Sequence, residues 1–71
     1  MAKLRVGVAG LGRGRLFVEL FNQLPSCEVV AVCDLLERAL APFKQLAAHA
    51  SYDEFLGEGL DIVAVITSDR G

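Results

Sequence analysis

Three glycines and one carboxylate are the residues of this chain whose types and spacing point most clearly to chemistry. Gly10, Gly12 and Gly14 follow an apolar run, and Asp34 ends the next apolar run. Glycines after a strand let the backbone approach a pyrophosphate, whose charge is stabilised by N–H groups at the start of a helix. A carboxylate roughly 20 residues later can accept hydrogen bonds from a ribose. The pattern therefore predicts a dinucleotide site.

The cofactor is expected to contact the glycine turn, the carboxylate and the end of a later strand. The candidate residues are Gly10, Leu11, Gly12, Arg13, Gly14, Asp34, Thr67 and Ser68. Simpler roles stay open, because glycines also permit a sharp turn, a carboxylate also caps a helix, and Arg13, Arg15, Thr67 and Ser68 also suit a solvated surface. His49 has no Cys or acid at metal-ligand spacing, and we expect it to be a loop residue.

Composition limits the classes of protein that fit. The chain has 71 residues, a net charge of -2, 54% hydrophobic residues and a mean hydropathy of +0.46. It is one small domain with more apolar surface than it can bury. Its scattered Lys and Arg predict no nucleic-acid partner, and its apolar runs are too short for a membrane span. Cys27 and Cys33 lie too far apart on one strand to bridge, so we expect small core residues in a cytoplasmic protein.

Strands and helices alternate along the sequence. Apolar, β-branched runs predict four strands, at residues 3–9, 28–33, 47–50 and 61–67. A first helix is expected at residues 13–24, where Pro25 ends it, with a buried stripe of Leu16, Phe17, Leu20, Phe21 and Leu24.

Two further helices complete the pattern. Asp34 and Glu37 predict an acidic capping box at the start of the second, and Pro42 predicts a kink or a break into two turns. Its buried stripe is expected to be Leu36, Ala39, Leu40, Phe43 and Leu46. A second capping box, Ser51 to Glu54, predicts a brief helix that Gly57 and Gly59 end.

This alternation predicts an α/β fold with a parallel sheet in the order 3-2-1-4. The two longer helices would lie on one face and the brief helix on the other, which would be nearly bare. The fourth strand would be an apolar open edge, which native folds avoid. We therefore expect residues 1–71 to be an incomplete, N-terminal part of a doubly wound (Rossmann) domain whose second half is missing.

On these segments the chain resembles a known family. Residues 4–12 (LRVGVAGLG), 28–34 (EVVAVCD) and 37–39 (ERA) are similar to the N-terminus of the glucose-fructose oxidoreductase and inositol dehydrogenase family, Gfo/Idh/MocA. Residues 52–56 and 60–67 are similar to the short helix and fourth strand of that family, so the resemblance covers essentially the whole chain.

The resemblance implies a two-domain, NAD(P)-dependent oxidoreductase that acts on a sugar, a cyclitol or a related compound. The catalytic lysine of the family, in a Glu-Lys-Pro motif, and its substrate domain follow the fifth strand, so this chain alone is expected to be inactive. Arg15 stands at the third glycine position of the family's turn, and Ser68-Asp69 stands where the family tends to have Pro-Asn. We expect NAD rather than NADP, since Asp34 would repel a 2′-phosphate, and we expect the full-length protein to form a homo-oligomer.

Two other functions remain open. One is a non-catalytic remnant or interaction module that binds dinucleotide weakly or not at all. The other is a fragment of a methyltransferase, because the three glycines also fit a loop for S-adenosylmethionine. Val8 counts against the methyltransferase, since such loops usually have an acid two residues before the first glycine.

Overall fold

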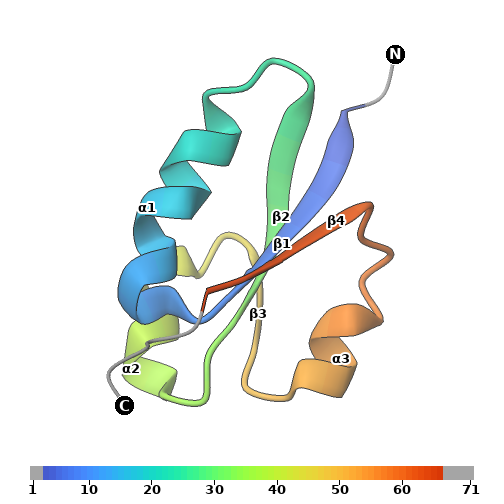
Figure 1. Ribbon diagram of the computed structural model, residues 1–71. Helices are drawn as coiled ribbons and strands as arrows, with labels where there is room; N and C mark the ends of the chain where they lie inside the picture. The colour runs from blue at the N-terminus through green and yellow to red at the C-terminus, as the bar shows by residue number, and fades with distance from the viewer. Residues whose placement is uncertain (1–2, 67–71) are drawn as a thin grey trace.

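The molecule is built on a four-stranded parallel sheet with helices on both faces (Figure 1). The structure, a computed structural model, describes residues 3–66. Thr67, Ser68 and Asp69 therefore lie outside the described residues. The elements are β1 (Leu4–Ala9), α1 (Leu11–Asn22), β2 (Cys27–Cys33), α2 (Glu37–Leu40), the 3₁₀ helix η1 (Ala41–Phe43), β3 (Ala47–His49), α3 (Tyr52–Leu56) and β4 (Ile62–Val65).

The strand order is β3-β2-β1-β4, with parallel pairing throughout. The predicted fold class and order are confirmed. α1 and α2 lie on one face of the sheet and α3 lies on the other, as Figure 1 shows. Right-handed crossovers place α1 and α2 on one face while the chain runs from β1 to β3. They place α3 on the opposite face because the chain then reverses direction to put β4 beside β1.

β2 carries one more residue than the stretch of β1 with which it pairs. Val6 pairs with Val29, but the next residue of β1 pairs with Ala31, which leaves Val30 as a bulge. Val29 and Val32, three positions apart, therefore both pack in the core beneath α1. Without the bulge, the alternation of a strand would have turned Val32 to the opposite face.

An apolar cluster lies on each face of the sheet. The larger one fills the space under α1, α2 and η1, and its buried members are Val6, Val8, Leu11, Val18, Cys27, Val29, Val32 and Phe43. The smaller one lies under α3, where Phe55 is fully buried with Ala9, Ala31 and Cys33. Both cysteines are free and buried, as predicted.

The predicted buried stripe of α1 is wrong. Leu16 and Leu20 are 66% and 53% exposed, and Phe17 and Leu24 are also exposed. The buried residues of α1 are Leu11, Gly14 and Val18, while Phe21 packs partly against the core. The helix also begins and ends two residues earlier than predicted, because its start is set by the turn at Gly10 rather than by its apolar pattern.

The second helix is much shorter than predicted. α2 is a single turn that continues into η1, and Pro42 lies in that 3₁₀ helix, so the predicted break is confirmed. The predicted capping box is wrong, because Leu36 is the N-cap residue and makes no side-chain cap. Phe43 is buried as predicted, whereas Leu36 is exposed.

The face under α3 depends on a glycine in the middle of β1. A Cβ at Gly7 would stand 2.7 Å from the Phe55 ring and 2.4 Å from the Leu60 side chain. The absence of that Cβ lets Phe55 lie directly on the sheet. Elsewhere this face is open, since Val63 and Val65 of β4 are exposed.

Candidate functional site

The turn between β1 and α1 requires glycine at its first position. Gly10 has a φ of 88°, and a Cβ there would stand 2.2 Å from the carbonyl oxygen of Ile66. Its N–H donates to Cys33 O at 2.9 Å, which ties the turn to the end of β2. The carboxyl ends of β1, β2 and β4 therefore meet at this turn.

Asp34 directly follows β2 and binds the start of α1. Its Oδ2 accepts from Leu11 N–H at 2.8 Å, and its Oδ1 accepts from Leu36 N–H at 2.9 Å. The Asp34 backbone N–H donates to His49 O at 3.1 Å. The bulge in β2 contributes to this arrangement, because it turns Val32, and two residues later Asp34, toward α1. Asp34 thus lies beside the glycine turn, and the helix that it was expected to cap begins three residues later.

The first amides of α1 point out of the helix end, since a helix has no internal acceptors for them. Leu11 N–H donates to the Asp34 carboxylate, and Gly14 N–H donates to Gly10 O at 2.9 Å. Among the described residues, no acceptor pairs with the amides of Gly12 and Arg13. A Cβ at Gly12 would meet nothing within 4 Å, so the space beside this amide is open.

Gly14 provides the close packing of α1 on the sheet. A Cβ there would stand 3.0 Å from Val8 Cγ1 and 3.5 Å from Ile66 Cγ1. Arg15, which stands at the third glycine position of the family that the chain resembles, is exposed. The packing glycine is therefore one residue earlier in this chain, and the arginine does not obstruct the contact.

A cleft of about 650 Å³ opens at this end of the sheet. Its wall combines the glycine turn, the carboxylate and apolar groups: Ala9, Gly10, Cys33, Asp34, Leu35, Leu36, Ala50, Tyr52, Val65 and Ile66. Leu35 is 86% exposed, and Leu36 and Tyr52 are about half exposed. Large apolar side chains around a mostly apolar cleft suit a ligand with a flat apolar part.

Charge in the cleft comes chiefly from Asp34. Burial raises the pKa of the Cys33 thiol, and the neighbouring Asp34 carboxylate raises it further, so this thiol stays protonated at neutral pH. Arg38 is exposed on α2, and within residues 3–66 it forms no ion pair with Asp34. The same residues hold no cluster of His, Cys, Asp and Glu suited to a metal ion.

The structure thus brings together Gly10, Leu11, Gly12, Arg13, Gly14 and Asp34, whereas Thr67 and Ser68 lie outside the described residues. Sequence reasoning missed Leu35, Leu36 and Tyr52, whose only signal was their position just after β2 and at the start of α3. It also misplaced His49, which is the last residue of β3 rather than a loop residue. No helix within the described part of the chain is long and apolar enough to cross a membrane.

Comparison with known proteins supports the fold. No family model matches the chain, and no curated protein matches it. An NAD-binding protein from Listeria innocua is 30% identical with a TM-score of 0.79, over 92% of this chain and 20% of that one. The WlbA dehydrogenase from Bordetella pertussis, solved with NADH and UDP-GlcNAcA, is 25% identical with a TM-score of 0.81, over 92% of this chain and 22% of that one. The chain therefore spans about a fifth of the length of each.

Proposed function

We propose that this chain is the NAD-binding portion of an oxidoreductase of the Gfo/Idh/MocA type that acts on a sugar, a cyclitol or a related compound. The observation that carries the proposal is that two amides without an acceptor, those of Gly12 and Arg13, lie at the same end of the sheet as the Asp34 carboxylate, which binds the neighbouring amide of Leu11. Similarity to an NAD-binding protein and to a dehydrogenase solved with NADH supports it.

The start of α1 fits a pyrophosphate. The amides of Gly12 and Arg13 supply donors, and the missing Cβ of Gly12 leaves the space that a phosphate needs. The exposed Arg13 side chain adds a positive charge at the same helix end. NAD, when bound, supplies the hydride-transfer chemistry, while these residues only bind and orient it.

Asp34 fits a ribose diol. A carboxylate has roughly four acceptor sites, and Leu11 and Leu36 use one on each oxygen. The remaining sites can accept from the 2′ and 3′ hydroxyls of NAD. A 2′-phosphate there would bring like charges together at a cost of several kcal/mol, which favours NAD over NADP.

The β4 edge supports a larger domain. β4 pairs with β1 on one side, and its Val63 and Val65 side chains are exposed on the face of α3. We propose that further strands and helices of a longer protein cover this edge and face. Catalysis and substrate binding would then belong to residues outside this chain, in a cytoplasmic homo-oligomer, and the chain alone would bind NAD without oxidising substrate.

Calorimetric titration with NAD and NADP tests the proposal. We expect the natural chain to bind NAD more tightly than NADP. In Asp34→Ser, the ratio of the NAD affinity to the NADP affinity should fall at least about tenfold. Gly12→Val should weaken both cofactors, because its side chain fills the space beside the amides. Glu19→Ser, an exposed change farther along α1, is the control and should change neither affinity. Preference for NADP, or an unchanged preference in Asp34→Ser, would remove the role given to Asp34.

A non-catalytic interaction module is a second candidate, favoured by the exposed apolar face of α1. A groove of about 340 Å³ lies on this face, lined by Phe17, Leu20, Phe21, Gln23 and Leu24. The same titration separates the two candidates. Binding of neither nucleotide by the natural chain would favour the interaction module.

A further inference from the structure

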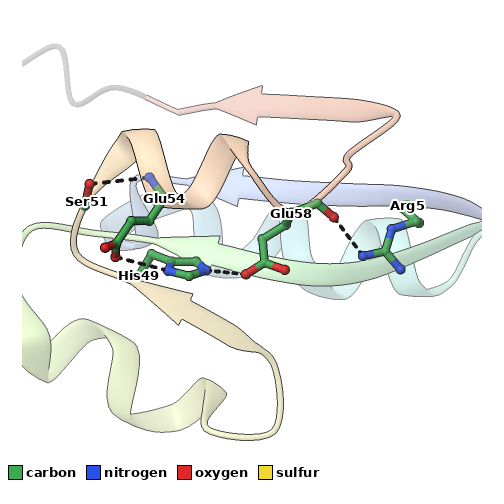
Figure 2. Close-up of polar contacts among 5 residues, drawn as sticks. All are labelled: Arg5, His49, Ser51, Glu54 and Glu58. Carbon is green, nitrogen blue, oxygen red and sulfur yellow. Dashed lines mark hydrogen bonds and ion pairs between the residues drawn. The ribbon is translucent and has the colours of Figure 1, made fainter.

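A histidine lies between two carboxylates at the end of β3. His49 Nε2 is 2.5 Å from Glu58 Oε2, and His49 Nδ1 is 3.8 Å from Glu54 Oε1 (Figure 2). Glu54 belongs to α3, and Glu58 lies two residues beyond the end of that helix. One ring therefore contacts a residue within α3 and a residue of the turn that follows it.

The protonation state of the ring decides how many of these contacts are favourable. An imidazolium has two N–H donors and a positive charge, so it can serve both carboxylates. A neutral imidazole has one donor, and its other nitrogen presents a lone pair to the second carboxylate. The His49 side chain is 20% exposed and that of Glu58 is 29% exposed, so water screens this pair less than a surface pair.

The surroundings of His49 link it to the cleft. Only two residues separate it from Tyr52, which lines the cleft and opens α3. The His49 carbonyl accepts from Asp34 N–H, so its backbone is held by the residue that follows β2. A change in how α3 lies on β3 therefore moves one wall of the cleft.

The charged and titratable groups around the ring come from three directions. Glu54 and Glu58 face it from α3 and the turn after it, Cys33 is its register partner on β2, and Asp34 follows Cys33 with both carboxylate oxygens bound to backbone amides. From β1, the Arg5 guanidinium donates to Glu58 O at 2.9 Å (Figure 2), and it also donates to Gly59 O at 3.0 Å. Arg5 holds the backbone of the turn, which leaves the Glu58 carboxylate to His49.

We propose that His49 is a proton-dependent positioning residue, which on protonation holds α3 and Tyr52 against the sheet and so raises the affinity of the cleft for dinucleotide. The ligand half of this inference rests on the function proposed above. The positioning half concerns this chain alone and does not need a ligand.

Composition makes the positioning half directly measurable. The chain has one histidine, one tyrosine and no tryptophan, so the imidazole NMR signals report His49 alone and the intrinsic fluorescence reports Tyr52 alone. As the pH is varied, we expect Tyr52 emission to change in step with the protonation of the His49 ring that the imidazole signals report. His49→Gln should abolish the Tyr52 change, and Glu58→Gln should reduce it. Glu28→Gln, an exposed carboxylate on β2, should leave it intact.

The ligand half is tested by titrating NAD, whose pyrophosphate does not ionise near neutral pH. We expect the natural chain to bind NAD about fivefold more tightly at a pH where the imidazole signals show a protonated His49 ring than at a pH where they show a neutral ring, and His49→Gln to bind equally at both. A His49 ring that titrates without any change at Tyr52, or pH dependence kept in His49→Gln, would overturn the inference. If NAD binds at neither pH while Tyr52 still follows His49, the proposed function fails and the positioning role stands.

Discussion

Asp34 and Leu11 are joined by a hydrogen bond of 2.8 Å, which the first amide of α1 donates to the Asp34 carboxylate just after β2. The two residues are 23 positions apart, so the bond forms only when both strands are in place. It ties the first turn of α1 to the tip of β2. It also holds the carboxylate beside the amides that are proposed to receive a pyrophosphate.

Removing the Asp34 carboxylate should therefore destabilise the chain without any ligand. Asp34→Ala leaves the amides of Leu11 and Leu36 without acceptors, and we expect the free energy of unfolding in urea to fall by about 1–2 kcal/mol. Asp34→Asn keeps one acceptor oxygen and should lie between. Glu19→Ala, an exposed change on α1, is the control, and equal stability in all four proteins would contradict the role of the bond.

Gly12 and Gly14 should respond oppositely to the same substitution. Gly14→Ala places a Cβ 3.0 Å from Val8 Cγ1, so α1 must move away from the sheet, and we expect a loss of about 1–3 kcal/mol. Gly12→Ala meets open space and should leave stability unchanged or slightly raised, because alanine is the better helix former. Thermal unfolding of the two variants measures the difference. A Gly14→Ala protein as stable as Gly12→Ala would show that this glycine is not needed for packing.

The Cys33 thiol should react slowly at neutral pH. Its pKa is raised by burial and by the Asp34 charge, and the thiolate is the reactive form. In a Cys27→Ser background, alkylation of Cys33 should accelerate only in alkaline solution, and Asp34→Asn should move that acceleration to lower pH. Rapid alkylation at neutral pH in the folded natural chain would contradict this.

The raised Cys33 pKa also predicts the sign of a stability change. The folded chain favours the protonated thiol more than the unfolded chain does, so this contribution is complete below the unfolded-state pKa. It is lost as the pH rises through the folded-state pKa. The difference in unfolding free energy between the natural chain and Cys33→Ala should therefore shrink in alkaline solution, and a difference that grows there would have the wrong sign.

The two faces of α1 should differ in their sensitivity to truncation. Leu16 is 66% exposed and Val18 is 5% exposed, so Leu16→Ala should change the unfolding free energy by less than about 0.5 kcal/mol and Val18→Ala should cost about 2 kcal/mol. A larger cost at Leu16 than at Val18 would restore the helix face that the apolar pattern predicts.

Sequence by itself determined the strand order, the sharp turn at Gly10 and the place of Asp34 beside it. Alternating strands and helices leave few right-handed parallel arrangements, and all of them bring the carboxyl ends of β1 and β2 to one edge of the sheet. The glycine itself was enough to predict the turn, because the backbone conformation and the close approach at Gly10 allow no other residue type.

Only the tertiary structure decided which face of α1 is buried, where β2 bulges, and what His49 contacts. Counting large apolar residues favoured Leu16 and Leu20, but the face that packs on the sheet carries Gly14, whose small size permits the close approach. The distant bond from Leu11 to Asp34 ties the start of the same helix to β2. The bulge at Val30 has no local signal, since every neighbouring residue is apolar. The pairing of His49 with Glu58 exists only because α3 folds back over β3, an approach that neither residue's neighbours in the chain encode.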